Sequence, residues 1–189
     1  AATGVGADAL EAGAARGATL DIDVLGEVLA TTRGMCDVAA SLGAHAEQAP
    51  SLAAIAHEID GVLLERPAAE LERGLDGHGG VRDTASIELA QTRRALATSR
   101  AAATETLRTT AQRVRQHLQE SFVTERAGRP VLAVKASSRS AVPGLVHDRS
   151  ATGQTIFVEP LEVVDANNRV RELEAAERIE VERVLAALS

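Results

Sequence analysis

The stretch that decides the fold is GRPVLAVKASSRSAVPGLVHDRSATGQTIFVEP, which covers residues 128–160. Its three short runs rich in apolar and β-branched residues lie at 131–136, 145–149 and 155–158. The runs are separated by turn signals, Pro143-Gly144 and Ala151-Thr152-Gly153. Short runs with short connections are typical of antiparallel strands. We therefore predict a small antiparallel β unit in which the three strands form a meander.

Helical patterns flank this β unit on both sides. Before it, no proline or glycine interrupts residues 86–121, and Ser86 is a suitable N-cap. Its apolar stripe is thin, with a heptad between Leu89 and Leu96, which suits a two-helix arm better than a globular core. After the β unit, residues 161–188 place apolar side chains on one face and alternate Glu with Arg on the other. We predict a long helix out and a helix back, paired as in a coiled coil.

Residues 1–80 predict a separate helical body. A first helix should begin after Asp21, a good N-cap residue, with Leu20 and Leu25 placed to form a hydrophobic staple. Pro50 should open a second helix, and Pro67 should lie in the first turn of a short helix that ends near Gly74. The apolar face of the second helix is expected to hold Leu52, Ile55, Ile59 and Leu63.

The predicted class is mainly α: a helical body with a long antiparallel helical arm that carries a small antiparallel β tip. Following these elements, we divide the chain into a body (1–80), an outgoing lever helix (81–121), a clamp-like β tip (122–160) and a returning lever helix (161–189). The missing initiator Met leads us to expect an internal piece of a longer chain.

Charge is spread unevenly along the chain. Residues 1–80 hold 13 acidic and 4 basic side chains, a net charge of −9, whereas residues 81–160 hold 7 acidic and 12 basic, a net charge of +5. The whole-chain value of −7 argues against nucleic-acid binding, but the middle block permits it. The alternative is that these arginines only keep helix faces in solution.

Several function classes find no support in the sequence. A P-loop needs Gly-Lys-Ser/Thr, and the one lysine, Lys135, lies between Val134 and Ala136, so no ATP site or other cofactor is expected here. No apolar run approaches the ~20 residues that cross a bilayer, so we expect no membrane contact. His147 and Asp148 are neighbours and would point to opposite faces of a strand, which rules out a catalytic relay with Ser150. We expect no enzyme activity in this chain.

A family resemblance rests on the motifs GRPVLAVK (128–135), VPGLVHDRSATGQTIFVEP (142–160) and NNR (167–169), with DTAS (83–86) upstream. These motifs resemble the second bacterial MutS paralogue family, relatives of mismatch-repair MutS. The resemblance is specific over residues 81–189 and weak before them. It implies the core, lever and clamp region of a cytoplasmic, nucleoid-associated protein whose ATPase and endonuclease domains lie elsewhere.

The resemblance further implies a homodimer that binds DNA, including branched DNA, and suppresses recombination as part of DNA repair. Contact with ribosomal RNA during ribosome rescue is implied for some members. A lever or dimerisation module that transmits the ATPase state without touching DNA is the alternative.

The candidate binding residues are the cations of the tip. Residues 122–158 carry a net charge of +3, and we predict sequence-independent backbone contact through Lys135, Arg139 and Arg149, with Arg129 in support. The alternative is that these charges only solubilise the tip. Structural roles are expected for Ser86 as a helix cap, for Phe157 in the tip core, and for Asn167 and Asn168 as a brace between arm and tip. Contact of the two asparagines with a partner chain is the other interpretation.

Overall fold

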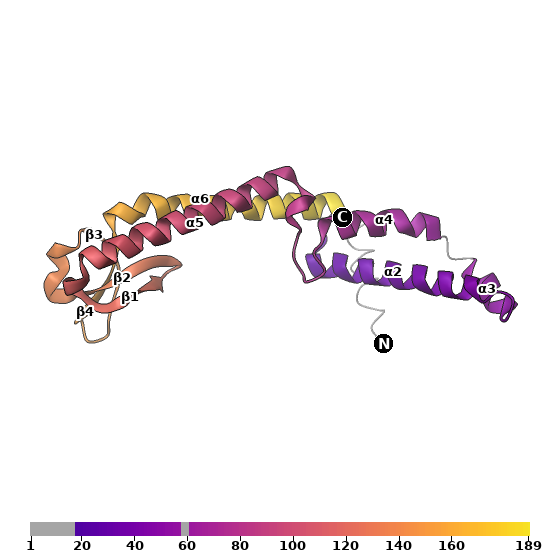
Figure 1. The fold of residues 1–189 in the computed structure, drawn as a ribbon, viewed down its shortest axis with the longest axis horizontal. Helices are drawn as coiled ribbons and strands as arrows, with labels where there is room; N and C mark the ends of the chain where they lie inside the picture. Colours follow the sequence, from indigo (N-terminus) through magenta and orange to yellow (C-terminus); the bar gives the residue numbers. More distant parts are fainter. Residues whose placement is uncertain (1–17, 58–60) are drawn as a thin grey trace. The chain divides into compact units, whose positions relative to one another are not determined.

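The computed structural model describes residues 18–57 and 61–189 and confirms a mainly α chain with a small antiparallel β tip (Figure 1). The helices are α2 (Ile22–Ala44), α3 (Pro50–Ala56), α4 (Gly61–Gly74), α5 (Ile87–Arg113) and α6 (Leu161–Leu188). The strands are β1 (Leu118–Arg126), β2 (Arg129–Lys135), β3 (Gly144–Arg149) and β4 (Thr155–Pro160). Short 3-10 turns are η1 (Asp83–Ala85), η2 (Arg115–His117) and η3 (Ala136–Ala141).

Contacts between residues group the chain into two compact units. One, here called the body unit, combines the chain up to Ala90 with Arg178–Ser189. The other, the tip unit, is Gln91–Glu177. The tip unit therefore holds the sheet together with most of α5 and the larger, N-terminal part of α6.

In the body unit, α2 packs against α4. Leu25 is 2% exposed and clusters with Leu71 and Leu75, and Leu20 packs against the same cluster, as the predicted staple requires. The helix begins at Ile22 directly after Asp21, as expected, although Asp21 makes no side-chain cap hydrogen bond. An ion pair between Arg33 and Glu72 at 2.5 Å joins the two helices at their surface.

Two expectations for the body were wrong. Pro67 lies inside α4 instead of opening a helix, since the helix already begins at Gly61 and its part after Pro67 is anchored by the buried residues Ala68 and Leu71. α3 ends at Ala56 and turns its small residues inward, which leaves Leu52 and Ile55 half or more exposed. Ile59 lies outside the described residues.

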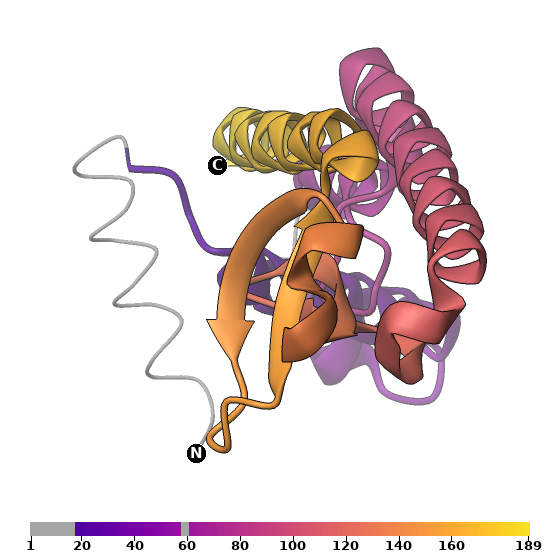
Figure 2. The ribbon, with the colours of Figure 1, turned by 90° about the vertical axis from the view of Figure 1, so that its left-hand side faces the viewer.

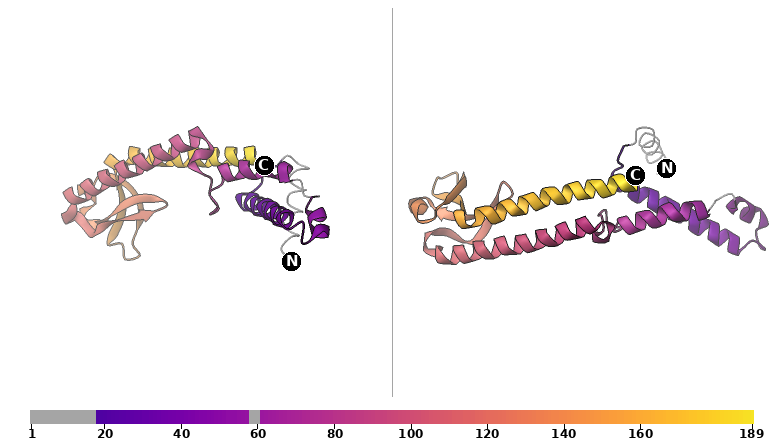
Figure 3. Two further views of the ribbon diagram at one scale, coloured as in Figure 1. Left: turned by 45° about the vertical axis from the view of Figure 1, so that its right-hand side comes forward. Right: turned by 90° about the horizontal axis from the view of Figure 1, so that it is seen from above.

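Helices α5 and α6 run side by side and antiparallel in the tip unit (Figure 3, right). Ser86 caps α5, since its Oγ accepts a hydrogen bond from the Leu89 amide at 2.9 Å. Leu96, Leu107 and Leu173 are buried along the pair. Polar links are Arg93–Glu177 and Arg100–Glu174, each at 2.8 Å, and Arg113–Glu162.

The sheet has the order β1-β2-β4-β3, with all neighbours antiparallel, so the predicted meander was wrong. The edge strand β3 and its neighbour β4 run side by side in Figure 2. β3 lies at the edge, and β4 inserts between it and β2. The outgoing helix was also too long in the prediction, since it ends at Arg113 and the chain is already a strand at Leu118. One face of the sheet packs on the helices through a buried core that comprises Leu107, Ala111, Val114, Leu118, Leu132, Val134, Val142, Ile156, Val158 and Val163.

Replacing Ser86 with Ala should destabilise the start of α5. The substitution removes the acceptor for the Leu89 amide, and loss of such a cap costs about 1 kcal/mol. Thermal unfolding and hydrogen exchange at the Leu89 amide would measure the effect. Ser99→Ala, within the same helix, is the matched control and should not reduce stability. Equal stability of both variants would contradict the capping role.

Glu162 should make the tip unit sensitive to acid. Hydrogen bonds from Arg113 and Thr110 lower the pKa of the Glu162 carboxyl below its usual 4.5. The stabilisation is therefore complete above that ordinary pKa and is lost as the pH falls through the lowered folded value. Because the Glu162 side chain is 51% exposed, we expect its contacts to contribute less than about 1 kcal/mol to the free energy of unfolding.

The free energy of unfolding of the wild type, measured with denaturant, should fall between about pH 6 and about pH 3. In Glu162→Gln this fall should be smaller. Glu125→Gln, an exposed carboxylate of β1, is the control. An identical pH profile for Glu162→Gln and wild type would show that the Glu162 contacts do not stabilise the fold.

Candidate nucleic-acid interface

The strand pairing brings predicted binding residues together at one end of the sheet. Lys135, the last residue of β2, pairs with Thr155, and Arg149, the last residue of β3, pairs with Ile156. Both cations therefore flank the beginning of β4. Arg139 follows in η3, which directly continues from Lys135. We call this set, together with Arg115, the cationic end.

Arg115 belongs to the cationic end although it was not among the predicted residues. The Lys135 Nζ donates a hydrogen bond to the backbone oxygen of Gln116 at 3.1 Å, which fixes η2 beside the last residue of β2. Arg115 is exposed in this turn. The predicted helix extends to Ser121 and would put Arg115 on a helix face. The position of Arg115 beside β2 follows only if a strand begins at Leu118.

The four cations differ in how their side chains are engaged. Arg139 donates to the backbone oxygens of Val142 at 3.0 Å and Gly144 at 2.8 Å, so it holds the entry to β3. Within the described residues, the guanidinium groups of Arg115 and Arg149 make no hydrogen bond or ion pair, and both side chains are exposed. Arg115 and Arg149 are thus available to an incoming anion.

The nearest acidic side chain on β3, Asp148, is already occupied. Its Oδ2 lies 3.3 Å from the Arg126 Nε, and its Oδ1 accepts the backbone amide of Arg149 at 2.7 Å. Arg126 also stacks 3.7 Å above the ring centroid of Phe157. Phe157 is 9% exposed and clusters with Val131 and Ala133 on this face of the sheet. The Asp148 charge is therefore compensated by Arg126, and the Arg149 side chain keeps its full charge.

The turn between β3 and β4 is a second exposed part of this end. Ser150 organises it, because its Oγ accepts the Thr155 amide at 3.1 Å and its backbone oxygen accepts the Gly153 amide at 2.8 Å. Gly153 has a φ of +71°, a conformation that favours glycine. Residues 151–154 are exposed. The turn can offer the Thr152 hydroxyl and backbone amides as neutral donors beside Arg149.

Arg129 lies at the opposite end of β2, away from the other three predicted residues. Its Nε is 3.1 Å from the carboxylate of Glu159, and its Nη2 donates to Asn168 Oδ1 at 2.5 Å. The Arg129 side chain is only 19% exposed. The structure thus places Arg129 inside a polar network, with its donors directed at the protein.

Glu159 is the centre of this network and has no exposed surface. In addition to its contact with Arg129, the Glu159 carboxylate accepts a hydrogen bond from Asn167 Nδ2 at 2.8 Å. Its Oε2 lies 2.6 Å from His147 Nε2. A buried carboxylate is costly unless it is paired and hydrogen-bonded, and here both conditions are met. Asn167 and Asn168 are on α6, so the network joins three strands of the sheet to that helix.

Glu159→Gln should strongly destabilise the tip unit. The neutral amide keeps the shape but leaves the Arg129 charge buried without an anion, which costs about 3 kcal/mol or more. Urea unfolding would measure the change in the free energy of unfolding. Glu125→Gln removes an exposed carboxylate of the same sheet and should change it by less than about 0.5 kcal/mol. Similar values for the two variants would show that the network does not hold the fold.

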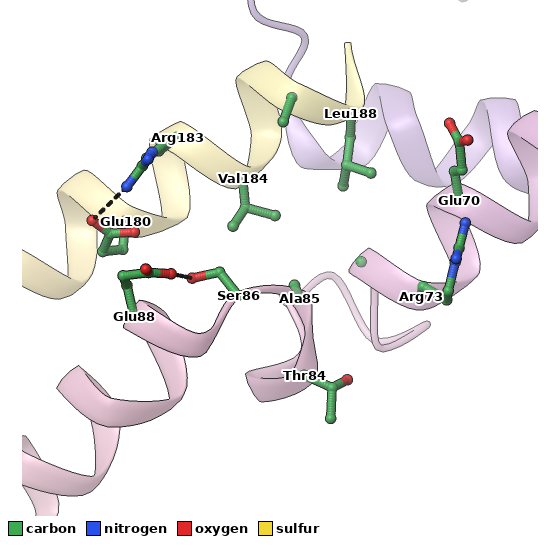
Figure 4. A pocket seen from close by; sticks show the side chains of 12 residues that line it. Glu70, Arg73, Thr84, Ala85, Ser86, Glu88, Glu180, Arg183, Val184 and Leu188 are labelled. Carbon is green, nitrogen blue, oxygen red and sulfur yellow. Dashed lines mark hydrogen bonds and ion pairs between the residues drawn. The ribbon is translucent and has the colours of Figure 1, made fainter.

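A cavity of about 590 Å³ in the body unit lies between α4, the start of α5 and the end of α6 (Figure 4). Arg183 Nη1 is 3.6 Å from Glu180 Oε1, whereas Glu180 Oε2 is buried without a hydrogen-bond partner. The charged residues that line the cavity are Glu70, Arg73, Glu88, Glu180 and Arg183. Both signs are present, so this cavity has no positive excess that would attract a phosphate backbone.

The described residues hold neither a metal-binding cluster nor a helix that could span a membrane. No three His, Cys, Asp or Glu side chains gather as a metal site would need. No helix in the part of the chain that the structure describes is both long and apolar enough to pass through a membrane.

Comparisons with known proteins point to one family. No family model matches the chain. Endonuclease MutS2 of Pelotomaculum thermopropionicum is 42% identical over 182 residues, which is 93% of this chain and 22% of that protein. Endonuclease MutS2 of Thermomicrobium roseum is 48% identical over 121 residues, 64% of this chain and 15% of that protein. The corresponding protein of Symbiobacterium thermophilum is 45% identical over 122 residues.

The chain spans only 15% to 22% of the length of these relatives, so the match concerns one segment of much longer proteins. The match to the Pelotomaculum protein extends over nearly the whole chain, including the body, where the sequence motifs were weak. The chain belongs to the MutS2 family and corresponds to one segment of its members.

Proposed function

We propose that the chain is the nucleic-acid-holding lever and clamp segment of a MutS2-type protein, and that the cationic end of its tip unit contacts the sugar-phosphate backbone. The observation that carries this proposal is the convergence of Lys135, Arg149 and Arg115 at one end of the sheet. Arg126 compensates Asp148, so the positive charge of this end is not cancelled by the neighbouring carboxylate.

The contact that this geometry favours is independent of sequence. Guanidinium and ammonium groups beside a turn can bind phosphates, whereas reading of bases requires donors and acceptors inserted into a groove. Stacking on single-stranded bases uses exposed aromatic rings. Phe157 is buried under Arg126 and does not offer such a surface. Duplex or branched DNA is therefore the proposed ligand class. Ribosomal RNA, which also offers a sugar-phosphate backbone, is the alternative ligand.

The relatives are named endonucleases, and we place the cleavage reaction, ATP hydrolysis and the main homodimer contact in segments outside this one. In this scheme the segment itself is not catalytic. The network around Glu159 would hold the tip in a fixed pose on α6, so that the full-length homodimer presents two cationic ends to branched DNA and suppresses recombination.

A second candidate function rests on the helix pair. α5 and α6 are linked by Arg93–Glu177, Arg100–Glu174 and Arg113–Glu162 along their shared length. A pair joined at several levels can transmit a displacement along its axis. The segment would then act as a lever or dimerisation module that reports the ATPase state without touching DNA. Dimerisation of this chain without nucleic-acid binding would favour this function.

The proposed contact predicts a defined salt dependence. Fluorescence anisotropy should show binding of the chain to a four-way junction and to a matched duplex. With about four phosphate contacts, the log–log salt slope should be about −3 to −4, at about 0.9 per contact. The triple variant Arg115→Ala, Lys135→Ala, Arg149→Ala should weaken binding and make the slope shallower by about 2.7. Arg139 is left intact because it supports the entry to β3.

The matched control removes the same charge from the body unit, through Arg66→Ala, Arg73→Ala and Arg178→Ala, and should bind as the wild type does. An RNA hairpin in the same titration separates the two ligand classes. Unchanged affinity and slope in the tip triple variant would refute the assignment of the cationic end. Tighter binding to the junction than to the duplex would support branched DNA as the ligand.

A further inference from the structure

A groove in the body unit has the opposite character to the cationic end. Its volume is about 740 Å³, and it lies between α2 and the glycine-rich loop that follows α4. Ile22 and Leu29, both partly exposed, contribute apolar surface, and Asp23 and Glu27 contribute two carboxylates. No Lys or Arg is among the described residues that line it. We call this site the acidic groove.

The two carboxylates of the acidic groove lack counterions. Asp23 and Glu27 are one helical turn apart on α2 and both are exposed. Within the described residues, neither makes an ion pair or a side-chain hydrogen bond. The segment around them is strongly acidic, with a net charge of −9 over residues 1–80. The electrostatic field at the groove therefore favours a cationic occupant and repels nucleic acid.

A helix-interior glycine gives the second observation. Gly26 lies in the groove, and a Cβ added there would meet nothing within 4 Å. Glycine is less favourable than alanine inside a helix, and no contact within the described chain requires its small size here. Ala30 is one turn further along the same side. Small residues one turn apart let another helix approach the α2 backbone closely.

The opposite wall of the groove is also backbone-rich. Gly77 and Gly79 have φ values of +79° and +82°, and neither would meet an atom within 4 Å of an added Cβ. Asp76 fixes the loop, because its Oδ1 accepts the amides of His78 at 2.7 Å and Gly80 at 2.9 Å. The loop is thus held in shape while its outer surface stays open.

We propose that the acidic groove is a docking site for a basic amphipathic helix of a protein partner. Apolar side chains of that helix would cover Ile22 and Leu29, its Lys or Arg side chains would pair with Asp23 and Glu27, and its backbone would pass close to Gly26. A second copy of the chain is a poor occupant, since two segments of charge −9 repel each other. This site is independent of the proposed nucleic-acid contact.

The test uses the whole chain and a fluorescent Leu/Lys helical peptide of about 14 residues, or four helical turns. Binding should shift the amide signals of Gly26, Gly77 and Gly79 in a glycine-labelled NMR sample and leave Gly144 and Gly153 of the tip unchanged. The same peptide with Glu in place of Lys should not bind. Shifts confined to other glycines would overturn the proposal.

Two pairs of variants separate docking from general attraction. Gly26→Leu fills the groove without loss of helix propensity and should weaken peptide binding by about tenfold or more. Gly34→Leu is the matched control, because Gly34 is on the same helix, has open space and does not line the groove. Asp23→Asn with Glu27→Gln should weaken binding more than Asp37→Asn with Glu47→Gln.

Equal weakening by groove and control variants, or no peptide binding at all, would refute the docking site. Sedimentation equilibrium on the free chain tests whether a second copy occupies the groove. A dimer that Gly26→Leu abolishes would assign the groove to a second copy and overturn the basic-helix proposal. Nucleic-acid binding plays no part in these measurements, so failure of one proposal does not affect the other.

Discussion

The tip unit depends on one buried negative charge, the Glu159 carboxylate. It has no exposed surface, and its partners come from β2 through Arg129, from β3 through His147 and from α6 through Asn167. A carboxylate in such a place is tolerated only when its hydrogen-bonding capacity is filled. Each partner is therefore held in a single position, and Asn168 extends the constraint by binding the other side of Arg129. The pose of the sheet on its helix follows from this network.

Local signals in the sequence were sufficient for most helix starts. Asp21 and Ser86 directly precede α2 and α5, although only Ser86 makes a side-chain cap hydrogen bond, and the change of pattern near residue 130 located the β tip. Interactions distant in sequence decided the rest. β1 carries no turn signal before it and is a strand because it pairs with β2, and β4 lies between β2 and β3 because both of its edges find partners there. Pro67 stays helical because the helix around it is anchored by its buried face.

For the candidate site, residue type was readable from sequence and position was not. Lys135, Arg139 and Arg149 are three of the five basic residues of the β tip. Antiparallel pairing brings Lys135 and Arg149 to one end of the sheet, and η3 continues from Lys135 to Arg139. The same pairing sends Arg129 to the other end, where it meets Glu159. Arg115 joins the group only through the bond between Lys135 and the backbone of η2. Neighbours in sequence thus separate in space according to the direction of each strand.

The connection between β4 and α6 contains no loop residue: the strand ends at Pro160 and the helix begins at Leu161. One residue inserted there would turn the whole of α6 by about 100° relative to the sheet, since an α-helix has 3.6 residues per turn. Asn167 would then leave Glu159, and the buried side of α6 would face solvent. Length variation within this family should therefore accumulate in turns with open space, such as the one that contains Gly153, while the spacing from Glu159 to Asn167 stays constant.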